Sequence, residues 1–436
     1  MKKQKVGIYV FTDPVRGRKV TKSDGYFDGA SYLGLRFIAS QIPKDMYDIT
    51  YVSKDTINTV DWALVSITSY YDVLNIIHEL HGKKISAKIS MGGAGYNNVG
   101  LLRDIAYVGT VGRGENTIAK ILREEEVDGL YYRSSNRDLS KPIRIRQLET
   151  FIEIEDKFYG GMYAEKSVGC PRKCFFCEYS WKHKYKRKDE LSPGGYESGV
   201  GDRETLFRDL KWESYEAFHH LVSALDGATE RTRFIINKPI KNSEITEKMF
   251  EMYDAPQKAF SLKLYCLLGY PFERRFEPEE TVTAITRARR SSSEHWADVE
   301  IISPHFIPMP FTPMECEPFN WHDFKFDILR YNWDKFGRGN INVKWRGEFA
   351  GSSVAAAEST IINRADISDI GKIKGVLCSQ KYAALNNSAK RTVLEKYFGD
   401  LLGPVASVAP YIVRNNDSSI AKAVYLSRAY GNTAQT

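Results

Sequence analysis

Three of the chain's six cysteines fall within eight residues, at Cys170, Cys174 and Cys177. Thiolates are the usual ligands of iron-sulfur clusters, and most clusters take four of them. A short loop that supplies only three can hold three irons of one cubane cluster. The fourth iron is then open to a small molecule that carries amino and carboxylate groups. The spacing therefore predicts Cys170, Cys174 and Cys177 as metal ligands of a reactive cluster.

Two alternative roles for these cysteines stay open. A structural zinc site could use the three thiolates together with His183, because thiolates and an imidazole can complete a tetrahedron around zinc. Alternatively, the three are buried thiols that cluster by accident. The zinc hypothesis implies another class of function, a zinc-stabilised nucleic-acid-binding protein whose basic loop is held by the cysteines.

A series of strands and helices must position this loop. From residue 159 the pattern predicts strands at 161–167, 232–237, 261–268 and 298–304, and helices near 213–225, 244–253 and 279–290. Such alternation indicates a partial or complete βα barrel, whose active site lies at the carboxyl ends of its strands. The cysteines directly follow the first of the predicted strands.

An earlier series of the same kind occupies the N-terminal part of the chain. It predicts strands at 6–11, 48–52, 62–66, 88–91 and 107–111, and helices at 30–41, 71–81 and 116–125. Short β-branched or aromatic runs that alternate with helices are typical of a doubly wound, Rossmann-like domain with a parallel sheet. We therefore expect an α/β fold throughout.

The 436 residues exceed what one hydrophobic core usually holds, so several domains are expected. We predict a Rossmann-like domain, a polar linker, a barrel and a small, mostly helical C-terminal extension, at residues 1–127, 128–158, 159–320 and 321–436.

Composition limits the class of protein. Hydrophobic residues make up 42% and charged residues 27%, as in ordinary globular chains. The apolar runs are too short to cross a bilayer, so no membrane association is expected. Six cysteines are too sparse for a disulfide scaffold, which indicates a reducing, cytoplasmic location.

The cysteine segment resembles the signature of the radical S-adenosylmethionine (SAM) superfamily, which has three and then two residues between its cysteines. Phe176 matches the aromatic residue before the last cysteine, and residues 167–171 resemble the family's entry into this loop. The resemblance implies a [4Fe-4S] cluster, cleavage of SAM to a 5'-deoxyadenosyl radical, hydrogen abstraction from an unactivated carbon, and an external electron donor. The barrel would then be of the partial (β/α)6 type.

Residues 267–273 resemble the Gly-x-Pro-x-Glu segment of family members with an N-terminal cobalamin-binding or methylthiotransferase domain. The resemblance implies cofactor contacts for Phe176, Gly269 and Glu273, and a glycine would let backbone approach the adenosyl group. An ordinary strand-to-helix turn explains Gly269 equally well. Tyr270 and His305 lie near predicted strand ends and are candidate catalytic residues.

The N-terminal domain resembles the cobalamin-binding (B12-binding) domain of such enzymes at Gly34-Leu35, Ser66-x-Thr68, Gly92-Gly93 and Gly112-x-Gly114-Glu115. The Asp-x-His-x-x-Gly sequence that supplies a histidine to cobalt is absent. The domain's histidines, His78 and His81, lie on a predicted helix. Either cobalamin binds without a protein ligand to cobalt or the domain has lost it and serves as a scaffold, and the missing motif favours loss.

A basic, partly aromatic run at 182–188 and the arginines Arg287, Arg289 and Arg290 suggest contacts with phosphate and bases. Such runs are also common on solvated surfaces. The leading hypothesis is therefore radical modification or rearrangement of a nucleic acid base or nucleotide. The alternative enzyme is a cobalamin-dependent radical SAM methyltransferase that acts on a peptide or metabolite.

Overall fold

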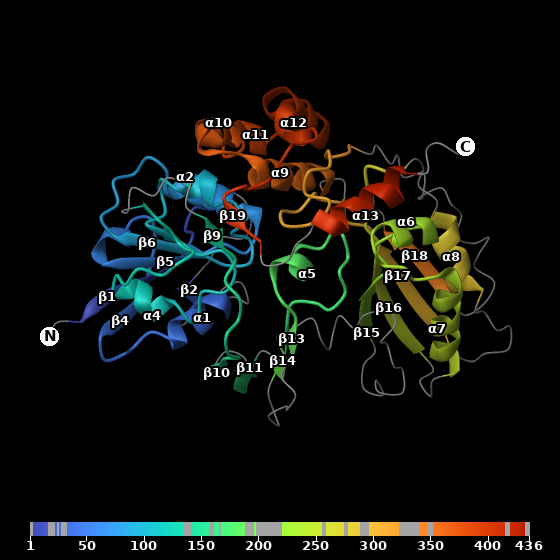
Figure 1. Ribbon diagram of the computed structural model, residues 1–436, viewed down its shortest axis with the longest axis horizontal. Coiled ribbons are helices and arrows are strands. Elements are labelled where there is room, and N and C mark those ends of the chain that lie inside the picture. Colours follow the sequence, from blue (N-terminus) through green and yellow to red (C-terminus); the bar gives the residue numbers. More distant parts are fainter. Residues whose placement is uncertain are drawn as a thin grey trace. The chain divides into compact units, whose positions relative to one another are not determined.

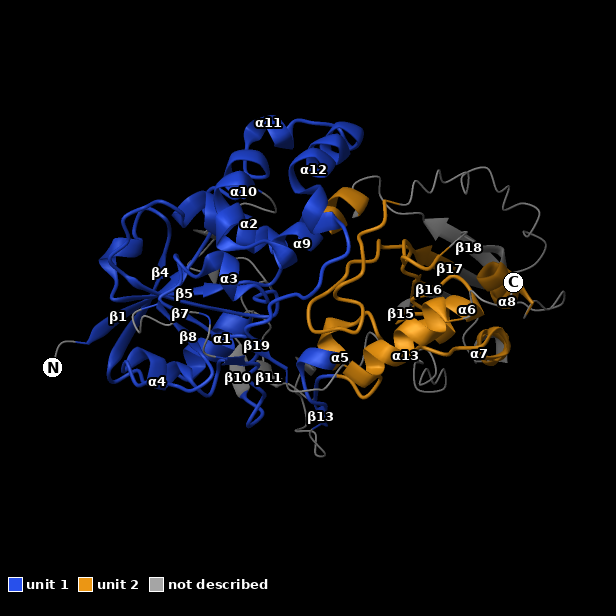
Figure 2. Ribbon diagram, turned by 45° about the horizontal axis from the view of Figure 1, so that its top comes forward, with its two compact units in different colours: residues 1–169, 181–198, 358–416 blue, residues 170–180, 199–357, 417–436 orange. Residues whose placement is uncertain are grey.

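The computed structural model covers the whole chain and describes most of its residues. The described residues are 3–15, 22–23, 26–27, 33–133, 139, 142–156, 161–164, 167–187, 196–197, 220–254, 259–273, 278–287, 296–321, 341–346, 352–414 and 419–431. They form two compact units, which Figure 2 shows in blue and orange. Unit 1 comprises residues 1–169, 181–198 and 358–416, and unit 2 comprises residues 170–180, 199–357 and 417–436.

Unit 1 is built on a six-stranded sheet. In the order β4-β1-β5-β6-β7-β8, its strands are Tyr47–Val52, Gln4–Tyr9, Trp62–Ser66, Lys88–Gly92, Val108–Gly109 and Tyr131–Tyr132. The first five strands run parallel, and β8 is antiparallel to β7. The short loops that follow parallel strands gather at one edge, so this edge is where a Rossmann-like sheet presents its functional residues.

The helices of unit 1 follow these strands (Figure 1). They are α1 (Leu33–Ser40), η2 (Ile57–Thr59), α2 (Tyr70–Leu80), α3 (Val99–Leu102) and α4 (Ile118–Leu122). One face of the sheet packs Val6, Trp62 and Leu64 into a hydrophobic core, and Ala63 and Val65 on the opposite face are also buried. Strands that are buried on both faces read as continuous apolar runs, which is why the sequence pattern located them.

Two later segments complete unit 1. Ile143, Ile145 and Leu148, from the stretch expected to be a linker, are buried, and β9 (Ile143–Arg144) pairs in parallel with β19 (Ile412–Val413). The C-terminal segment contributes α9 (Ser352–Arg364, shared between the units), η8 (Ile367–Asp369), α10 (Ile370–Val376), α11 (Gln380–Ala383) and α12 (Asn387–Leu402).

Unit 2 contains a four-stranded parallel sheet in the order β15-β16-β17-β18. These strands are His220–Ala224, Ala259–Tyr265, Trp296–Ile302 and Ile341–Arg346, and the helices are α6 (Glu230–Ile235), α7 (Asn242–Asp254), α8 (Pro278–Thr286) and α13 (Ser419–Tyr430). The helix α5 (Glu178–Lys182) follows the cysteines and is shared between the units. The mixture of parallel sheets and helices confirms the predicted α/β class.

Two secondary-structure predictions in unit 2 are wrong. Residues 232–237 are predicted as a strand, but residues 232–235 belong to helix α6, Ile236 caps it and Asn237 follows in a left-handed conformation. The Thr229 side chain caps this helix by accepting from the backbone amide of Thr232. Capping and tertiary contacts outweigh the weak intrinsic preference of β-branched residues. The predicted helix at 213–225 ends in strand β15, and its earlier residues lie outside the described part.

The short strands near the cysteines belong to other sheets. Strand β11 (Gly161–Ala164) pairs with β10 (Glu153–Asp156) and β14 (Tyr196–Glu197), and β12 (Ser167–Val168) pairs with β13 (Lys186–Arg187). The strands β2 (Lys22–Ser23) and β3 (Tyr26–Phe27) form a separate hairpin. Among the described helices, none combines the length and apolar character needed to cross a membrane.

Candidate active site

The three clustered cysteines lie on one loop of unit 2. Cys174 is buried, Cys170 and Cys177 are partly exposed, and none of the three is in a disulfide. Gly169 precedes them with φ +74°, a left-handed conformation that glycine adopts without strain. The amide of Cys177 donates to the carbonyl of Cys174 at 3.3 Å, which tightens the loop. The sequence thus folds these thiols into one compact turn.

Two hydrogen bonds fasten this loop to the end of helix α6. The backbone amide of Phe175 donates to the carbonyl of Ile236 at 2.9 Å. The side-chain amide of Asn237 donates to the carbonyl of Lys173 at 2.8 Å. The loop between the first and last cysteines is therefore held at both Lys173 and Phe175 by one neighbouring turn.

The cysteines line a cavity of about 760 Å³ that is formed entirely by residues of unit 2. Ala224 and Tyr265, the last residues of β15 and β16, also line it, together with Pro304, which follows β17. The cavity therefore lies at the carboxyl ends of parallel strands, where α/β folds bind ligands. Its volume lies within the range of about 300–1,000 Å³ that is usual for small-molecule sites.

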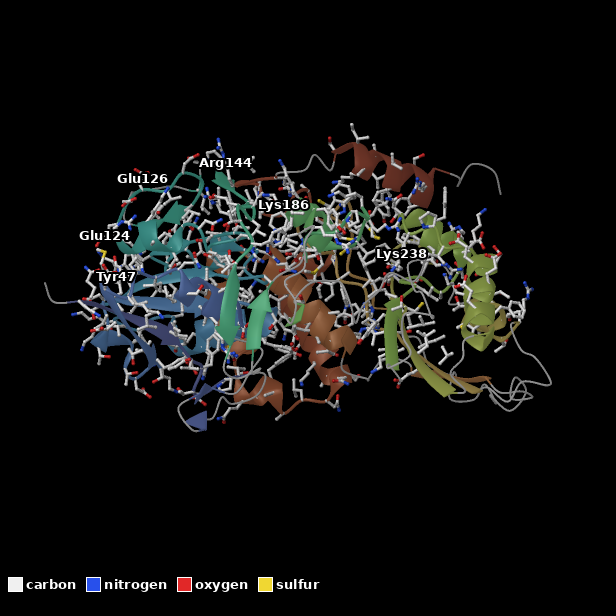
Figure 3. The ribbon with its side chains drawn as sticks, turned by 90° about the horizontal axis from the view of Figure 1, so that it is seen from below. Tyr47, Glu124, Glu126, Arg144, Lys186 and Lys238 are labelled. Atoms are coloured by element: carbon white, nitrogen blue, oxygen red, sulfur yellow. The ribbon has the colours of Figure 1, made fainter. Side chains whose placement is uncertain are left out.

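The cavity also contains a close ion pair. Lys238 Nζ lies 2.5 Å from Asp226 Oδ2, and each side chain is 13% exposed. Figure 3 labels Lys238 among the side chains of unit 2. We did not predict Lys238, Asp226 or Asn237 from the sequence. Their position in the sequence could have indicated them, because ligands of α/β folds bind beyond the carboxyl ends of strands, where polar residues follow buried elements.

Burial dominates the electrostatics of the thiols. It raises the pKa of Cys174 to about 12, although the Lys238 ammonium lowers this pKa. Burial likewise raises the pKa of Cys177, against hydrogen bonds from Ser180 that lower it. A buried thiolate is unfavourable by itself, and iron bound to its sulfur would supply the missing positive charge.

The donor set fits a cluster of several metal ions. Three cysteines on one loop can each bind a different iron, so their sulfurs need not converge on one point. In the part of the chain that the structure describes, no three His, Cys, Asp or Glu side chains are grouped to hold a single metal ion. His183, the fourth ligand in the zinc hypothesis, is among the described residues and forms no such group with the cysteines.

The turn at residues 269–273 of unit 2 contains two of the predicted cofactor contacts, Gly269 and Glu273. Gly269 has φ +86°, and a Cβ there would lie 2.5 Å from the imidazole of His305, so this ring occupies the space beside the glycine. One Glu273 oxygen accepts from the amides of Gly269 and Tyr270, at 2.8 and 3.1 Å. Burial raises the pKa of Glu273 to about 7, although these amides lower it.

The other predicted site residues are packed close to this turn. Tyr270 is fully buried, and its hydroxyl donates to the backbone carbonyl of Asp226 at 2.8 Å. His305 is 6% exposed and its ring stacks on Phe319. Phe176 lines the cavity and meets the Tyr270 ring edge to face at 6.2 Å. Phe176 and the cysteines thus line the cavity, while Gly269, Tyr270, Glu273 and His305 are not among its lining residues.

The glycines that resemble a cobalamin-binding domain are explained by contacts within unit 1. Gly93 has φ +119°, and a Cβ there would lie 2.4 Å from the carbonyl oxygen of Ile67. Gly112 has φ +90°, and its Cβ would lie 2.3 Å from the carbonyl oxygen of Arg146. The chain's own backbone fills the space beside both glycines, so contacts within the chain account for these two glycines without a corrinoid.

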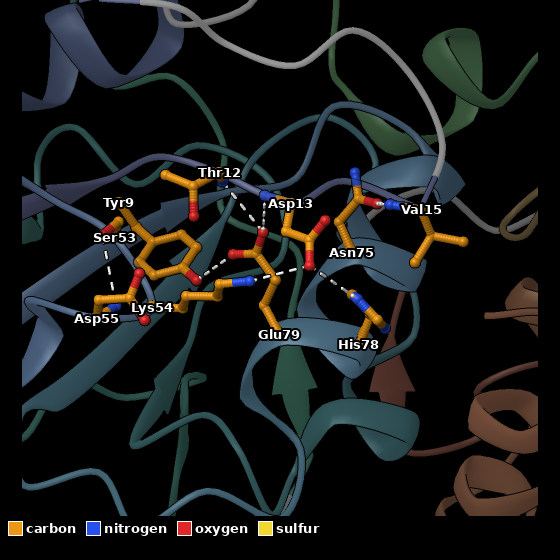
Figure 4. A network of polar contacts seen from close by, with 10 residues as sticks. All are labelled: Tyr9, Thr12, Asp13, Val15, Ser53, Lys54, Asp55, Asn75, His78 and Glu79. Atoms are coloured by element: carbon orange, nitrogen blue, oxygen red, sulfur yellow. Dashed lines mark hydrogen bonds and ion pairs between the residues drawn. The ribbon is translucent and has the colours of Figure 1, made fainter. Parts of the chain in front are cut away.

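The histidine considered for this domain belongs to a polar network at the end of β1 (Figure 4). His78 Nε2 lies 3.6 Å from Asp13, which also pairs with Lys54 at 3.0 Å. The neighbouring Glu79 is buried and accepts from the Tyr9 hydroxyl and the amides of Thr12 and Asp13. This network fixes the chain that leaves β1.

The basic run at 182–188 is partly structural. Lys182 is 2% exposed and donates to the carbonyl of Ala94 and the side chain of Asn97. His183 is buried, and burial lowers its pKa to about 3. Lys186, labelled in Figure 3, donates to the carbonyl of Leu148. Residues 188, 289 and 290 lie outside the described part.

No protein-family model matches the chain, and a search of curated proteins found no match. Among solved structures, the chain is similar to the radical S-adenosylmethionine methyltransferase TsrM from Kitasatospora setae with cobalamin and a [4Fe-4S] cluster bound. The identity is 11%, the coverage is 83% of this chain and 73% of TsrM, and the TM-score is 0.32. For a TsrM structure with tryptophan and a SAM analogue bound, the identity is 12%, the coverage is 82% of this chain and 71% of TsrM, and the TM-score is 0.33.

The chain is also similar to the cobalamin-dependent S-adenosylmethionine radical enzyme OxsB in its apo form. The identity is 11%, the coverage is 91% of this chain and 61% of OxsB, and the TM-score is 0.26.

Proposed function

We propose that the protein is a radical SAM enzyme whose [4Fe-4S] cluster is held by Cys170, Cys174 and Cys177. The observation that carries this proposal is that three thiols of one loop line a cavity at the carboxyl ends of parallel strands. The strands β15 to β18 would form part of the partial (β/α)6 barrel. A cytoplasmic location would keep the thiols reduced.

Cys170, Cys174 and Cys177 would hold the cluster, and with an external electron donor the chemistry supplied there would be the one-electron cleavage of SAM into methionine and a 5'-deoxyadenosyl radical. The chain's own task is to position the reacting groups and to exclude competing reactions. Asn237 holds the cysteine loop through Lys173. Phe176 supplies an apolar wall beside the cysteines. Gly269 and Glu273 remain proposed cofactor contacts through the turn they form.

The proposed substrate is a small organic molecule or a peptide. The nucleic-acid hypothesis relied on the basic run and on Arg287, Arg289 and Arg290. Within the run, Lys182 and His183 are buried, whereas Lys184, Lys186 and Arg187 are exposed, as in an ordinary solvated surface. The cavity, by contrast, has the volume of a small-molecule site.

The first test is anaerobic purification and reconstitution with iron and sulfide, followed by reduction in the presence of SAM. Four irons per chain and release of 5'-deoxyadenosine are expected, and both should be lost in Cys174→Ala. The matched control is Cys378→Ala, since Cys378 is a buried thiol of unit 1. One tightly bound zinc and no cleavage of SAM would overturn the proposal in favour of a zinc-stabilised binding protein.

Cobalamin-dependent methylation of a peptide or metabolite is the second candidate. The observation that favours it is the order β4-β1-β5-β6-β7 of the parallel strands, which is the flavodoxin-like order. Such sheets bind ligands where the strand order reverses, here between β1 and β5. TsrM is a methyltransferase with cobalamin bound.

Retention of a corrinoid separates the two candidates. The protein would be incubated with hydroxocobalamin without oxygen, passed through a desalting column and examined by its visible spectrum. One corrinoid per chain would support methyl transfer. A protein that retains no corrinoid but still cleaves SAM would support hydrogen abstraction without cobalamin. Unit 1 would then serve as a scaffold.

A further inference from the structure

The ion pair between Lys238 and Asp226 has no part in the function proposed so far. Both residues line the cavity that contains the three cysteines, and both are 13% exposed. A buried pair of this kind is often no more stabilising than apolar residues of the same volume, because both charges lose their hydration. Its position beside the cysteines therefore indicates a role other than stability.

The backbone at both ends of the pair is held in an uncommon conformation. Asp226 has φ +57°, and Asn237, the residue before Lys238, has φ +61°. Asp and Asn are the residue types other than glycine that adopt this left-handed region most readily. The local sequence thus favours both turns of the cavity wall, and each turn carries one member of the ion pair.

Hydrogen bonds fix these two turns. The amide of Asp226 donates to the carbonyl of Tyr265 at 3.1 Å, and its carbonyl accepts from the hydroxyl of Tyr270 at 2.8 Å. The amide of Lys238 donates to the carbonyl of Arg233 at 2.9 Å. The ammonium and the carboxylate are consequently held at defined places in the wall.

Both charges lie in the wall of the cavity that Cys170, Cys174 and Cys177 also line. Asn237, the residue before Lys238, donates to the carbonyl of Lys173 in the cysteine loop at 2.8 Å. An ammonium and a carboxylate in this wall have opposite effects on negative charge beside them. A cluster bound there would become more negative by one unit on reduction, and it would experience the same two fields.

We propose that the pair of Lys238 and Asp226 sets the reduction potential of the cluster. This inference rests on the proposed function. Lys238 stabilises the reduced, more negative cluster and so raises the potential. Asp226 fixes the position of the ammonium and opposes its field. Net charge and local hydrogen bonding are among the main controls on the potentials of iron-sulfur clusters. The step is a one-electron reduction by an external donor, with no proton transferred.

The test is a redox titration of the reconstituted cluster, followed by electron paramagnetic resonance. Lys238→Gln should shift the midpoint potential to more negative values, and Asp226→Asn should shift it to more positive values. Lys238→Arg keeps the charge and should stay close to the wild-type potential. The control is Lys241→Gln, an exposed lysine three positions further along the chain.

The outcomes distinguish this inference from the proposed function. A wild-type protein that assembles no cluster would overturn the function itself. A cluster whose potential is the same in wild type, Lys238→Gln and Asp226→Asn would overturn the inference and leave the function standing. Iron content is measured for each variant, and Asp226→Asn and Lys238→Arg still decide the question where Lys238→Gln does not fold.

Discussion

The side-chain amide of Asn237 donates a hydrogen bond of 2.8 Å to the carbonyl of Lys173, in the middle of the cysteine loop. Its side-chain oxygen accepts from Arg428 at 3.1 Å, and its backbone is left-handed, with φ +61°. This residue therefore connects the loop, the end of helix α6 and helix α13 within unit 2.

Asn237→Gly should keep the left-handed backbone and lose both side-chain hydrogen bonds. We expect a loss of about 1–2 kcal/mol in the free energy of unfolding. The loop should also retain less iron after reconstitution. Asn237→Asp is the matched variant, because its carboxylate still accepts from Arg428 but cannot donate to Lys173. Wild-type iron content in both variants would show that this contact does not position the loop.

Glu79→Leu should destabilise unit 1. Glu79 is 1% exposed and accepts three hydrogen bonds, from the Tyr9 hydroxyl at 2.5 Å and the amides of Thr12 and Asp13 at 3.1 and 2.7 Å. Leucine would leave these donors without their acceptor, at a cost of about 3 kcal/mol. Chemical denaturation measures the change, with the exposed Asp45→Asn as control. Equal stability of the two variants would contradict this account.

Gly93→Ala should be far more harmful than Gly371→Ala. At Gly93 the new Cβ would lie 2.4 Å from a backbone oxygen, in a conformation with φ +119°. Gly371 lies in helix α10 with nothing within 4 Å of such a Cβ. Alanine there should stabilise the helix by up to about 1 kcal/mol. Thermal unfolding of the two variants compares them directly, and a neutral Gly93→Ala would reopen this loop as a ligand contact.

Glu273 should make stability depend on pH. Burial raises its pKa from the usual 4.5 to about 7, so the folded protein binds a proton more tightly than the unfolded chain. The contribution of Glu273 to the free energy of unfolding is fully present below its pKa in the unfolded chain. It is lost as the pH rises through its pKa in the folded protein. It amounts to about 3 kcal/mol. In the metal-free protein, denaturation midpoints should fall between about pH 4.5 and 7. If the slope of stability against pH is unchanged in Glu273→Gln, the pH dependence comes from other groups.

The sequence predicted the strands of unit 1 and the cysteine loop, because these features depend on local pattern. Buried parallel strands read as apolar runs, as at Trp62–Ser66. The spacing of Cys170, Cys174 and Cys177 confines three thiols to one turn in any fold. By contrast, the β-branched residues at 232–237 misled the prediction, because a cap at Thr229 and burial of Arg233 outweighed local preference.

The tertiary structure alone decided what lies beside the cysteines. Asp226 and Lys238 are 12 residues apart, and their pairing depends on two left-handed turns that no periodicity reveals. Lys182 is a second example. The sequence shows it only as part of a basic run, whereas in the folded chain it is buried and donates to the side chain of Asn97. Local spacing can determine which residues bind a metal, but charge acts through space. The electrostatic surroundings of the site therefore emerge only when distant segments pack together.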